Sequence, residues 1–178
     1  MARVPLVRQA DLPEDYQYLL SEDALGERNI FRAMGNNPPV LRSYMLYGNT
    51  LWEEAGLDAH ERELVILAVG RALRSEYEWQ QHYDIGLDAG VTLDELRAIG
   101  RDDLSAFDDR VRATLEYAQA FATGDLTDDQ VEALDEWYDA TAVTGIGMLT
   151  SHYVATASML AGLAVPLEDA FVGWEPEA

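Results

Sequence analysis

The sequence predicts an all-α protein. Start and stop signals of helices recur along the whole chain, and no segment alternates apolar and polar residues as a half-buried strand does. Residues 58–61, 75–78 and 92–95 each match the capping box, which satisfies free backbone N–H groups at a helix start. Glycines at 90 and 124 follow predicted helices, as glycine commonly does at helix ends. These signals indicate a bundle of helices joined by short turns.

In the first half of the chain, the helical signals predict one or two short helices within 11–34 and longer ones over about 40–55, 58–73 and 75–89. The helix over 58–73 contains six consecutive apolar residues, Leu64–Val69, and so has no polar face over nearly two turns. We therefore expect this helix to be buried on all sides, at the core.

In the second half, a short helix is expected over 92–100, and a longer one follows an acidic linker and ends near residue 122. Another begins after Thr127, and the last covers about 140–163. This last helix is rich in Gly, Ala, Ser and Thr, which let another backbone approach closely. We expect tight helix packing there, within the chain or between subunits.

The whole chain, 1–178, is expected to form a single domain, because this length can bury a core without disulfides or a structural metal. Its expected parts are N-terminal helices (about 11–55), central helices (58–100), C-terminal helices (107–163) and a tail (166–178). The tail carries Phe171 and Trp174, which predict that it docks onto the body or onto a neighbouring subunit.

The charge balance limits the partners of the protein. The chain has 33 acidic and 12 basic residues, a formal net charge of −21, and no lysine. Such a charge repels phosphate backbones and anionic membrane surfaces, so neither nucleic acid nor membrane is an expected partner. A salt-loving host is the economical explanation, and a codon bias with an acidic interaction face is the alternative. The chain shows no long apolar run and no signal-peptide pattern, and we expect it in the cytoplasm.

The residue types exclude several chemistries. Without cysteine, the chain can form no disulfide, thiolate metal site or redox thiol. Any imidazole chemistry must use His60, His82 or His152. The helical Glu-x-x-His motif of di-iron sites does not occur, so we expect neither a metal nor another cofactor.

The best candidate site is the group Glu63, Ser75, Glu78 and His82. Residues 75, 78 and 82 share one face of a helix, so Glu78 can contact His82, and Glu63 comes from the preceding helix. A carboxylate beside an imidazole fixes its tautomer and raises its basicity, as a general acid or base requires. The alternative is structural: Ser75 and Glu78 form only a helix cap, and His82 is a hydrogen-bonded core residue.

Four further residues are candidates for substrate binding. Arg71 and Arg74 are the basic residues closest in sequence to the site, and they would pair with a substrate carboxylate. Trp79 either walls a pocket or packs in the core. His152 lies on an apolar helix face, either as a core histidine or as a second polar group of the pocket.

Three segments carry a family resemblance. Residues 61–69 (ERELVILAV), 75–82 (SEYEWQQH) and 90–95 (GVTLDE) resemble the carboxymuconolactone decarboxylase and alkylhydroperoxidase D-like family. The resemblance implies an all-α fold of the alkylhydroperoxidase D type that assembles as a homo-oligomer. It extends more loosely over most of the chain.

The resemblance also bears on activity. Where the peroxidase branch has Cys-x-x-Cys after its Glu and before its His, this chain has Ser75 and Glu78 between Glu63 and His82. Thiol peroxidase activity is therefore excluded, because that reaction passes through a thiolate and a disulfide. The resemblance implies a cofactor-free lyase or proton-transfer enzyme acting on a small carboxylated lactone or related carbonyl acid. His82, oriented by Glu78 or Glu63, would be its general acid or base.

Two other functions are compatible with the sequence. One is a non-catalytic oligomeric binding or scaffold protein that keeps the fold without the cysteines, for which a fully packed interior around His82 would be the sign. The other is a metal-dependent enzyme that uses His82 with Glu63 and Glu78.

Overall fold

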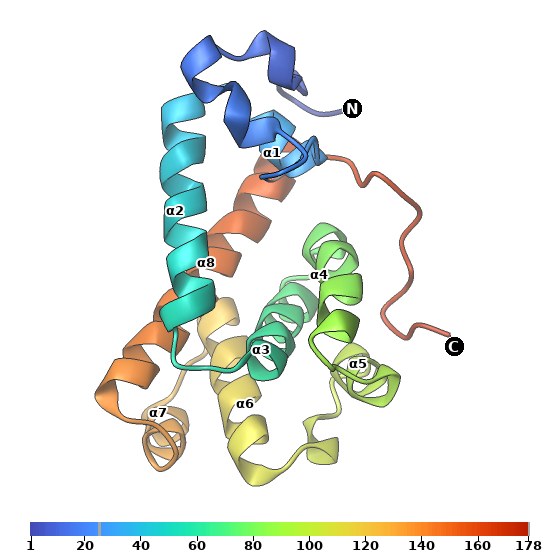
Figure 1. The fold of residues 1–178 in the computed structure, drawn as a ribbon. Helices are drawn as coiled ribbons and strands as arrows, with labels where there is room; N and C mark the ends of the chain where they lie inside the picture. The colour runs from blue at the N-terminus through green and yellow to red at the C-terminus, as the bar shows by residue number, and fades with distance from the viewer. Residues whose placement is uncertain (25, 178) are drawn as a thin grey trace.

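The computed structural model describes residues 1–24 and 26–177. Over these residues the chain is helical and has no strand, which confirms the predicted class (Figure 1). The elements are the 3-10 helices η1 (Gln9–Asp11), η2 (Glu14–Leu20) and η3 (Leu104–Ala106), and the α-helices α1 (Asn29–Met34), α2 (Pro38–Glu54), α3 (Ala59–Ala72), α4 (Glu76–Asp88), α5 (Leu93–Gly100), α6 (Asp109–Thr123), α7 (Asp128–Asp135) and α8 (Ala140–Leu163). The segment 11–34 thus contains 3-10 turns and one short α-helix. In the described part of the chain, none of the helices is long and apolar enough to cross a bilayer.

Helix α3 lies at the centre of the bundle and packs against α4, α5, α6 and α8 (Figure 1). Every residue from Leu64 to Val69 is at most 1% exposed. The prediction of a helix buried on all sides is therefore confirmed. Removing this apolar surface from water is the main contribution that α3 makes to stability.

Helices α3 and α4 pack closely after a tight turn. Arg74, in the turn, has a φ of 53°, in the left-handed region. A Cβ added to Gly70 would lie 3.4 Å from the Cβ of Glu78, so the two backbones are near van der Waals contact. The turn therefore places the start of α3 and the middle of α4 side by side.

The predicted capping box at 75–78 is only half formed. Ser75 accepts a hydrogen bond from the N–H of Glu78, but the Glu78 side chain does not return one to the helix start. By contrast, Thr92 and Glu95 form a complete box at the start of α5. The carboxyl group of Glu78 points into the protein instead, where it contacts His82.

The box predicted at 58–61 is also half formed. Asp58 accepts from the N–H of Glu61, while the carboxylate of Glu61 pairs with Arg110 on α6. In both cases the acid side chain turns to another side chain instead of the backbone N–H at the helix start: Glu61 to Arg110 on α6, and Glu78 to His82 on its own helix.

The expected close packing of the last helix occurs within the chain. A Cβ on Gly145 of α8 would lie 2.5 Å from the carbonyl oxygen of Ala55, at the end of α2. Because the atom it would meet is backbone, neither side can move easily. The glycine therefore sets the distance at which α8 passes the end of α2.

We expect Gly145→Ala to lower the free energy of unfolding by roughly 1–3 kcal/mol, the usual cost of overpacking a tight contact. The matched control on the same helix is Gly162→Ala, because no atom lies within 4 Å of its added Cβ. That change should be neutral or stabilising by up to about 1 kcal/mol, as alanine favours helix more than glycine does. Chemical denaturation measures both, and equal effects would contradict the packing argument.

The tail docks onto the body of its own chain, passing beside α4 before its end reaches α5 (Figure 1). Trp174 packs edge-on against Trp79, with ring centroids 5.3 Å apart. The indole N–H of Trp79 donates to the carbonyl oxygen of Gly173 at 3.0 Å. Of the two interpretations of Trp79, packing in the core is therefore the right one.

Candidate active site

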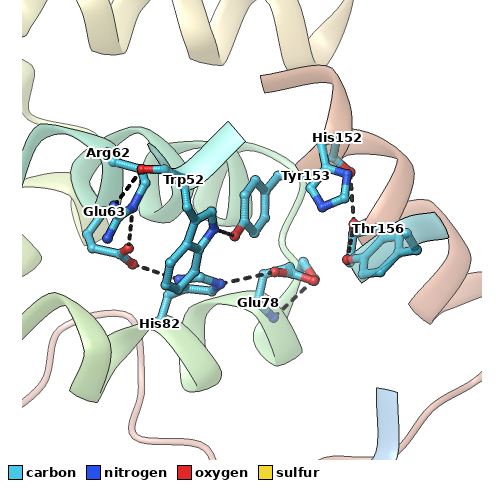
Figure 2. A network of polar contacts seen from close by, with 10 residues as sticks. Trp52, Arg62, Glu63, Glu78, His82, His152, Tyr153 and Thr156 are labelled. Carbon is cyan, nitrogen blue, oxygen red and sulfur yellow. Dashed lines mark hydrogen bonds and ion pairs between the residues drawn. The ribbon is translucent and has the colours of Figure 1, made fainter. Parts of the chain in front are cut away.

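The centre of the site is a hydrogen-bonded pair of side chains from adjacent helices. His82 Nδ1, on α4, lies 2.7 Å from Glu63 Oε2, on α3 (Figure 2). Glu63 is fully buried and His82 is 6% exposed. Because a carboxylate only accepts, Nδ1 carries the proton and Nε2 is left for chemistry. Glu63, and not Glu78, is thus the carboxylate that fixes the tautomer of His82.

Arg62 supports this pair from behind. Its Nε donates to Glu63 Oε1 at 3.1 Å, and its Nη1 donates to the carbonyl oxygen of Trp52 at 3.0 Å. Its guanidinium also lies over the Trp52 ring, 4.3 Å from the centroid. Arg62 therefore supplies the buried charge of Glu63 with a partner and holds Trp52 in place.

Glu78 lies on the other side of the imidazole. Its Oε2 is 3.8 Å from His82 Nε2, too far for a hydrogen bond. Its Oε1 is buried and has no hydrogen-bond partner among the described residues. Burial raises the pKa of Glu78 from 4.5 to about 7, and the positive charge of His82 opposes that rise. Glu78 is therefore a carboxyl group that changes its protonation state near neutral pH.

A cavity of about 310 Å³ opens beside Glu78 and His82. This volume is at the lower end of the range for small-molecule sites. The lining comes from α1, α2, α4, α8 and the segment before α1, and consists of Ala24, Arg28, Ile30, Phe31, Tyr44, Met45, Gly48, Asn49, Trp52, Tyr77, Glu78, Gln81, His82, Ile85, His152 and Tyr153. The surface of the walls is thus mostly apolar and aromatic, and Arg28, Asn49, Glu78, Gln81, His82 and His152 add charged, amide and imidazole groups.

His152 belongs to this cavity and comes from the same chain. It stacks on Tyr44, with ring centroids 4.6 Å apart. Burial lowers its pKa to about 4, and the charge of His82 adds to this effect. His152 is therefore a neutral imidazole at neutral pH and can give or accept a hydrogen bond without carrying charge.

The structure does not bring the other predicted residues to the cavity. Arg71 donates to the carbonyl oxygen of Gly100 at 2.7 Å and lies over Trp174. Arg74 and Ser75 line a separate hollow between the α3–α4 turn and the end of α8. Among the described residues, the arginine that does line the site is the exposed Arg28. Nearness in sequence was misleading, because Glu63 lies near the start of α3, whereas Arg71 lies near its end and Arg74 in the following turn.

Three residues of the site were not predicted from the sequence: Trp52, Arg62 and Tyr153. Trp52 and Tyr153 share a hydrogen bond of 2.8 Å, although 101 positions separate them in sequence.

Within residues 1–24 and 26–177, no group of three or more His, Asp or Glu side chains is arranged to hold a metal ion.

Glu78→Gln is expected to stabilise the protein above neutral pH. Because the folded protein holds the Glu78 proton up to about pH 7 and the unfolded chain releases it near 4.5, stability is lost as pH rises across that window. The full loss above pH 7 is on the order of 3 kcal/mol, and the neutral amide avoids it. Denaturation of both proteins at pH 4 and pH 8 measures this: we expect near-equal stabilities at pH 4 and a gap at pH 8. A gap independent of pH would contradict the assignment.

The part of the chain that carries the candidate site matches a known protein family. The family model described as the carboxymuconolactone decarboxylase family matches residues 38–120. This segment belongs to the carboxymuconolactone decarboxylase family. The family segment includes Trp52, Arg62, Glu63, Glu78 and His82, and ends before α8. The resemblance noted in the sequence is thus confirmed. No curated protein sequence matches the chain.

Solved structures show the same fold over nearly the whole chain. An alkylhydroperoxidase AhpD core, a peroxidase-related protein from Ralstonia eutropha JMP134, is 21% identical with a TM-score of 0.78, and the match covers 99% of this chain and 98% of that one. A peroxidase-related protein from Silicibacter sp. TM1040 is 20% identical with a TM-score of 0.80, covering 97% and 94%. The debrominase Bmp8, as a variant in complex with 2,3,4-tribromopyrrole, is 16% identical with a TM-score of 0.77, covering 93% and 91%. At these identities the likeness shows the fold and not the activity.

Proposed function

We propose that the protein is a cofactor-free lyase or proton-transfer enzyme that acts on a small carboxylated lactone or related carbonyl acid. The observation that carries the proposal is the pair of titratable groups at one cavity. His82, with its tautomer fixed by Glu63, faces Glu78, whose Oε1 has no partner among the described residues. An oriented imidazole beside a carboxyl group that titrates near neutral pH is suited to acid–base catalysis.

The proposed lyase reaction breaks the bond between the substrate carbon and its carboxylate. Carbon dioxide leaves, and the electron pair moves onto the neighbouring carbonyl group to give an enolate. His82 in its charged form gives its Nε2 proton to the enolate carbon, and the carboxyl group of Glu78 then returns a proton to Nε2. Glu78 takes up a new proton from solvent, so atoms and charge balance over one turnover.

Arg28 takes the role in this proposal that the sequence suggested for Arg71 and Arg74. It is exposed and lines the cavity, whereas Glu78, His82 and His152 of the same cavity are buried. A guanidinium at this position can hold a second carboxylate of the substrate. The rest of the substrate then lies against the aromatic walls.

The cavity itself favours catalysis over a purely structural role. A fully packed interior around His82 would have supported a binding or scaffold protein, and a cavity of about 310 Å³ lies there instead. Self-association stays part of the proposal, because α8 has no charged residue in a chain of net charge −21 and exposes Met148.

Proton exchange tests the proposal without knowledge of the natural substrate. The protein is incubated in D₂O with a panel of small keto acids and carboxylated lactones, and NMR follows deuterium at the carbon next to the carbonyl group. We expect incorporation that depends on His82, together with release of carbon dioxide from at least one member. The matched control is His60→Gln, since His60 pairs with Glu95 outside the cavity. Neither exchange nor carbon dioxide release across the panel would count against an enzyme.

A further inference from the structure

Tyr153 lies against the proposed reaction centre. It comes from α8, is 5% exposed and lines the cavity. Its ring meets that of His82 edge-on, with centroids 5.1 Å apart. Its hydroxyl oxygen accepts a hydrogen bond of 2.8 Å from the indole N–H of Trp52 (Figure 2). This hydroxyl group takes no part in the proposed proton transfers.

The hydroxyl proton of Tyr153 is free to be donated. In its hydrogen bond with Trp52 the Tyr153 hydroxyl oxygen is the acceptor, and none of the described residues accepts the hydroxyl proton. Tyr44, on the same cavity, differs. Its hydroxyl lies 2.9 Å from Thr156 Oγ1, and Thr156 already donates its own proton to the carbonyl oxygen of His152 at 2.8 Å. Tyr44 must therefore donate to Thr156, so its proton is already used.

We propose that Tyr153 donates a hydrogen bond to the substrate carbonyl oxygen and stabilises the enolate that forms there. This inference rests on the proposed function and narrows its substrate class. The substrate must carry a carbonyl group next to the reacting carbon, so that negative charge develops on oxygen. No proton is transferred from Tyr153: the O–H bond stays intact, and the hydrogen bond strengthens as charge builds on the acceptor.

The surroundings of Tyr153 suit a neutral donor. Burial raises the pKa of Tyr153 well above its ordinary value, and the nearby charge of Glu78 adds to the rise, so the phenol keeps its proton. Donation from Trp52 into the hydroxyl oxygen polarises the O–H bond and makes it a better donor.

One framework orients the donor and the base together. Arg62 lies over the ring of Trp52, which holds Tyr153, and also binds Glu63, which holds His82. Both groups are therefore fixed before substrate arrives, which is the arrangement that makes such hydrogen bonds effective in catalysis.

Binding of 4-nitrophenol tests the proposal, because the oxygen attached to the ring of its phenolate carries negative charge, as the oxygen of an enolate does. The phenolate also absorbs light differently from the neutral phenol, so binding can be followed by absorbance. We expect the unaltered protein to bind the phenolate and Tyr153→Phe to bind it at least tenfold more weakly. The matched control, Tyr44→Phe, removes the same atom from the same cavity and should weaken binding by at most about threefold. Trp52→Phe, which keeps Tyr153 but removes the N–H that polarises it, should fall between the two.

The outcomes separate this inference from the proposed function, since phenolate binding requires no turnover. Equal affinity of the unaltered protein and a folded Tyr153→Phe variant would overturn the inference, as would no detectable binding by the unaltered protein. In the exchange assay, a donor to the enolate predicts that Tyr153→Phe lowers kcat with little change in KM. A purely structural role would instead alter the circular dichroism spectrum or raise KM.

Discussion

Replacing His82 with asparagine is expected to lower the rate of proton exchange by about 10²–10⁴-fold, the usual contribution of a general acid or base. The asparagine Nδ2, which matches His82 Nδ1 in position, can still donate to Glu63, which is 2.7 Å from Nδ1 in the unaltered protein, so the buried carboxylate keeps a partner. What the amide cannot do is take up and release a proton. We therefore expect a fall in kcat without loss of the fold, measured by NMR exchange and circular dichroism.

His152→Gln provides the comparison inside the same cavity. His152 is 7% exposed, and its pKa of about 4 leaves it uncharged at neutral pH, so it carries no proton between substrate and solvent. Its removal should raise KM and lower kcat less than tenfold. If the two variants lose the same amount of kcat, the assignment of His82 as the acid–base group is wrong.

The sequence was most informative where local chemistry decides the structure. Six consecutive apolar residues predicted the buried helix α3, and each of them is at most 1% exposed. The N-cap patterns predicted helix starts at Asp58, Ser75 and Thr92, since each of these side chains accepts the expected backbone hydrogen bond. Such signals depend on neighbours within one helical turn.

The sequence was less informative about where the acid side chains point. Glu78 and Glu95 have the same capping pattern, yet only Glu95 completes its box. A pattern of four residues cannot register that a cavity and an imidazole lie beside Glu78. The same limit explains Arg71, which is close to the site in sequence but reaches the carbonyl oxygen of Gly100. Tyr153 and Trp52 were missed because only the packing of α2 against α8 joins them.

Arg62→Met is expected to lower the free energy of unfolding by roughly 3–5 kcal/mol, because removing one partner of a buried ion pair leaves the other charge uncompensated. Glu63 is fully buried and would keep only His82 as a partner, while methionine preserves much of the packing volume of the arginine stem. Loss of the contact with the Trp52 ring should also loosen the orientation of Tyr153, so the variant should bind phenolate more weakly. Denaturation by urea measures the first effect, and titration with 4-nitrophenol measures the second.

The double variant Arg62→Met/Glu63→Gln separates lost charge pairing from lost packing. If the uncompensated carboxylate is the main cost, neutralising it should restore most of the stability, because removing both members of a buried pair is far less costly than removing one. The cost that persists, about 1 kcal/mol, then reports the hydrogen bond to the Trp52 carbonyl oxygen and the contact with its ring. A double variant as unstable as Arg62→Met would show instead that Arg62 acts through Trp52 and that its pairing with Glu63 contributes little.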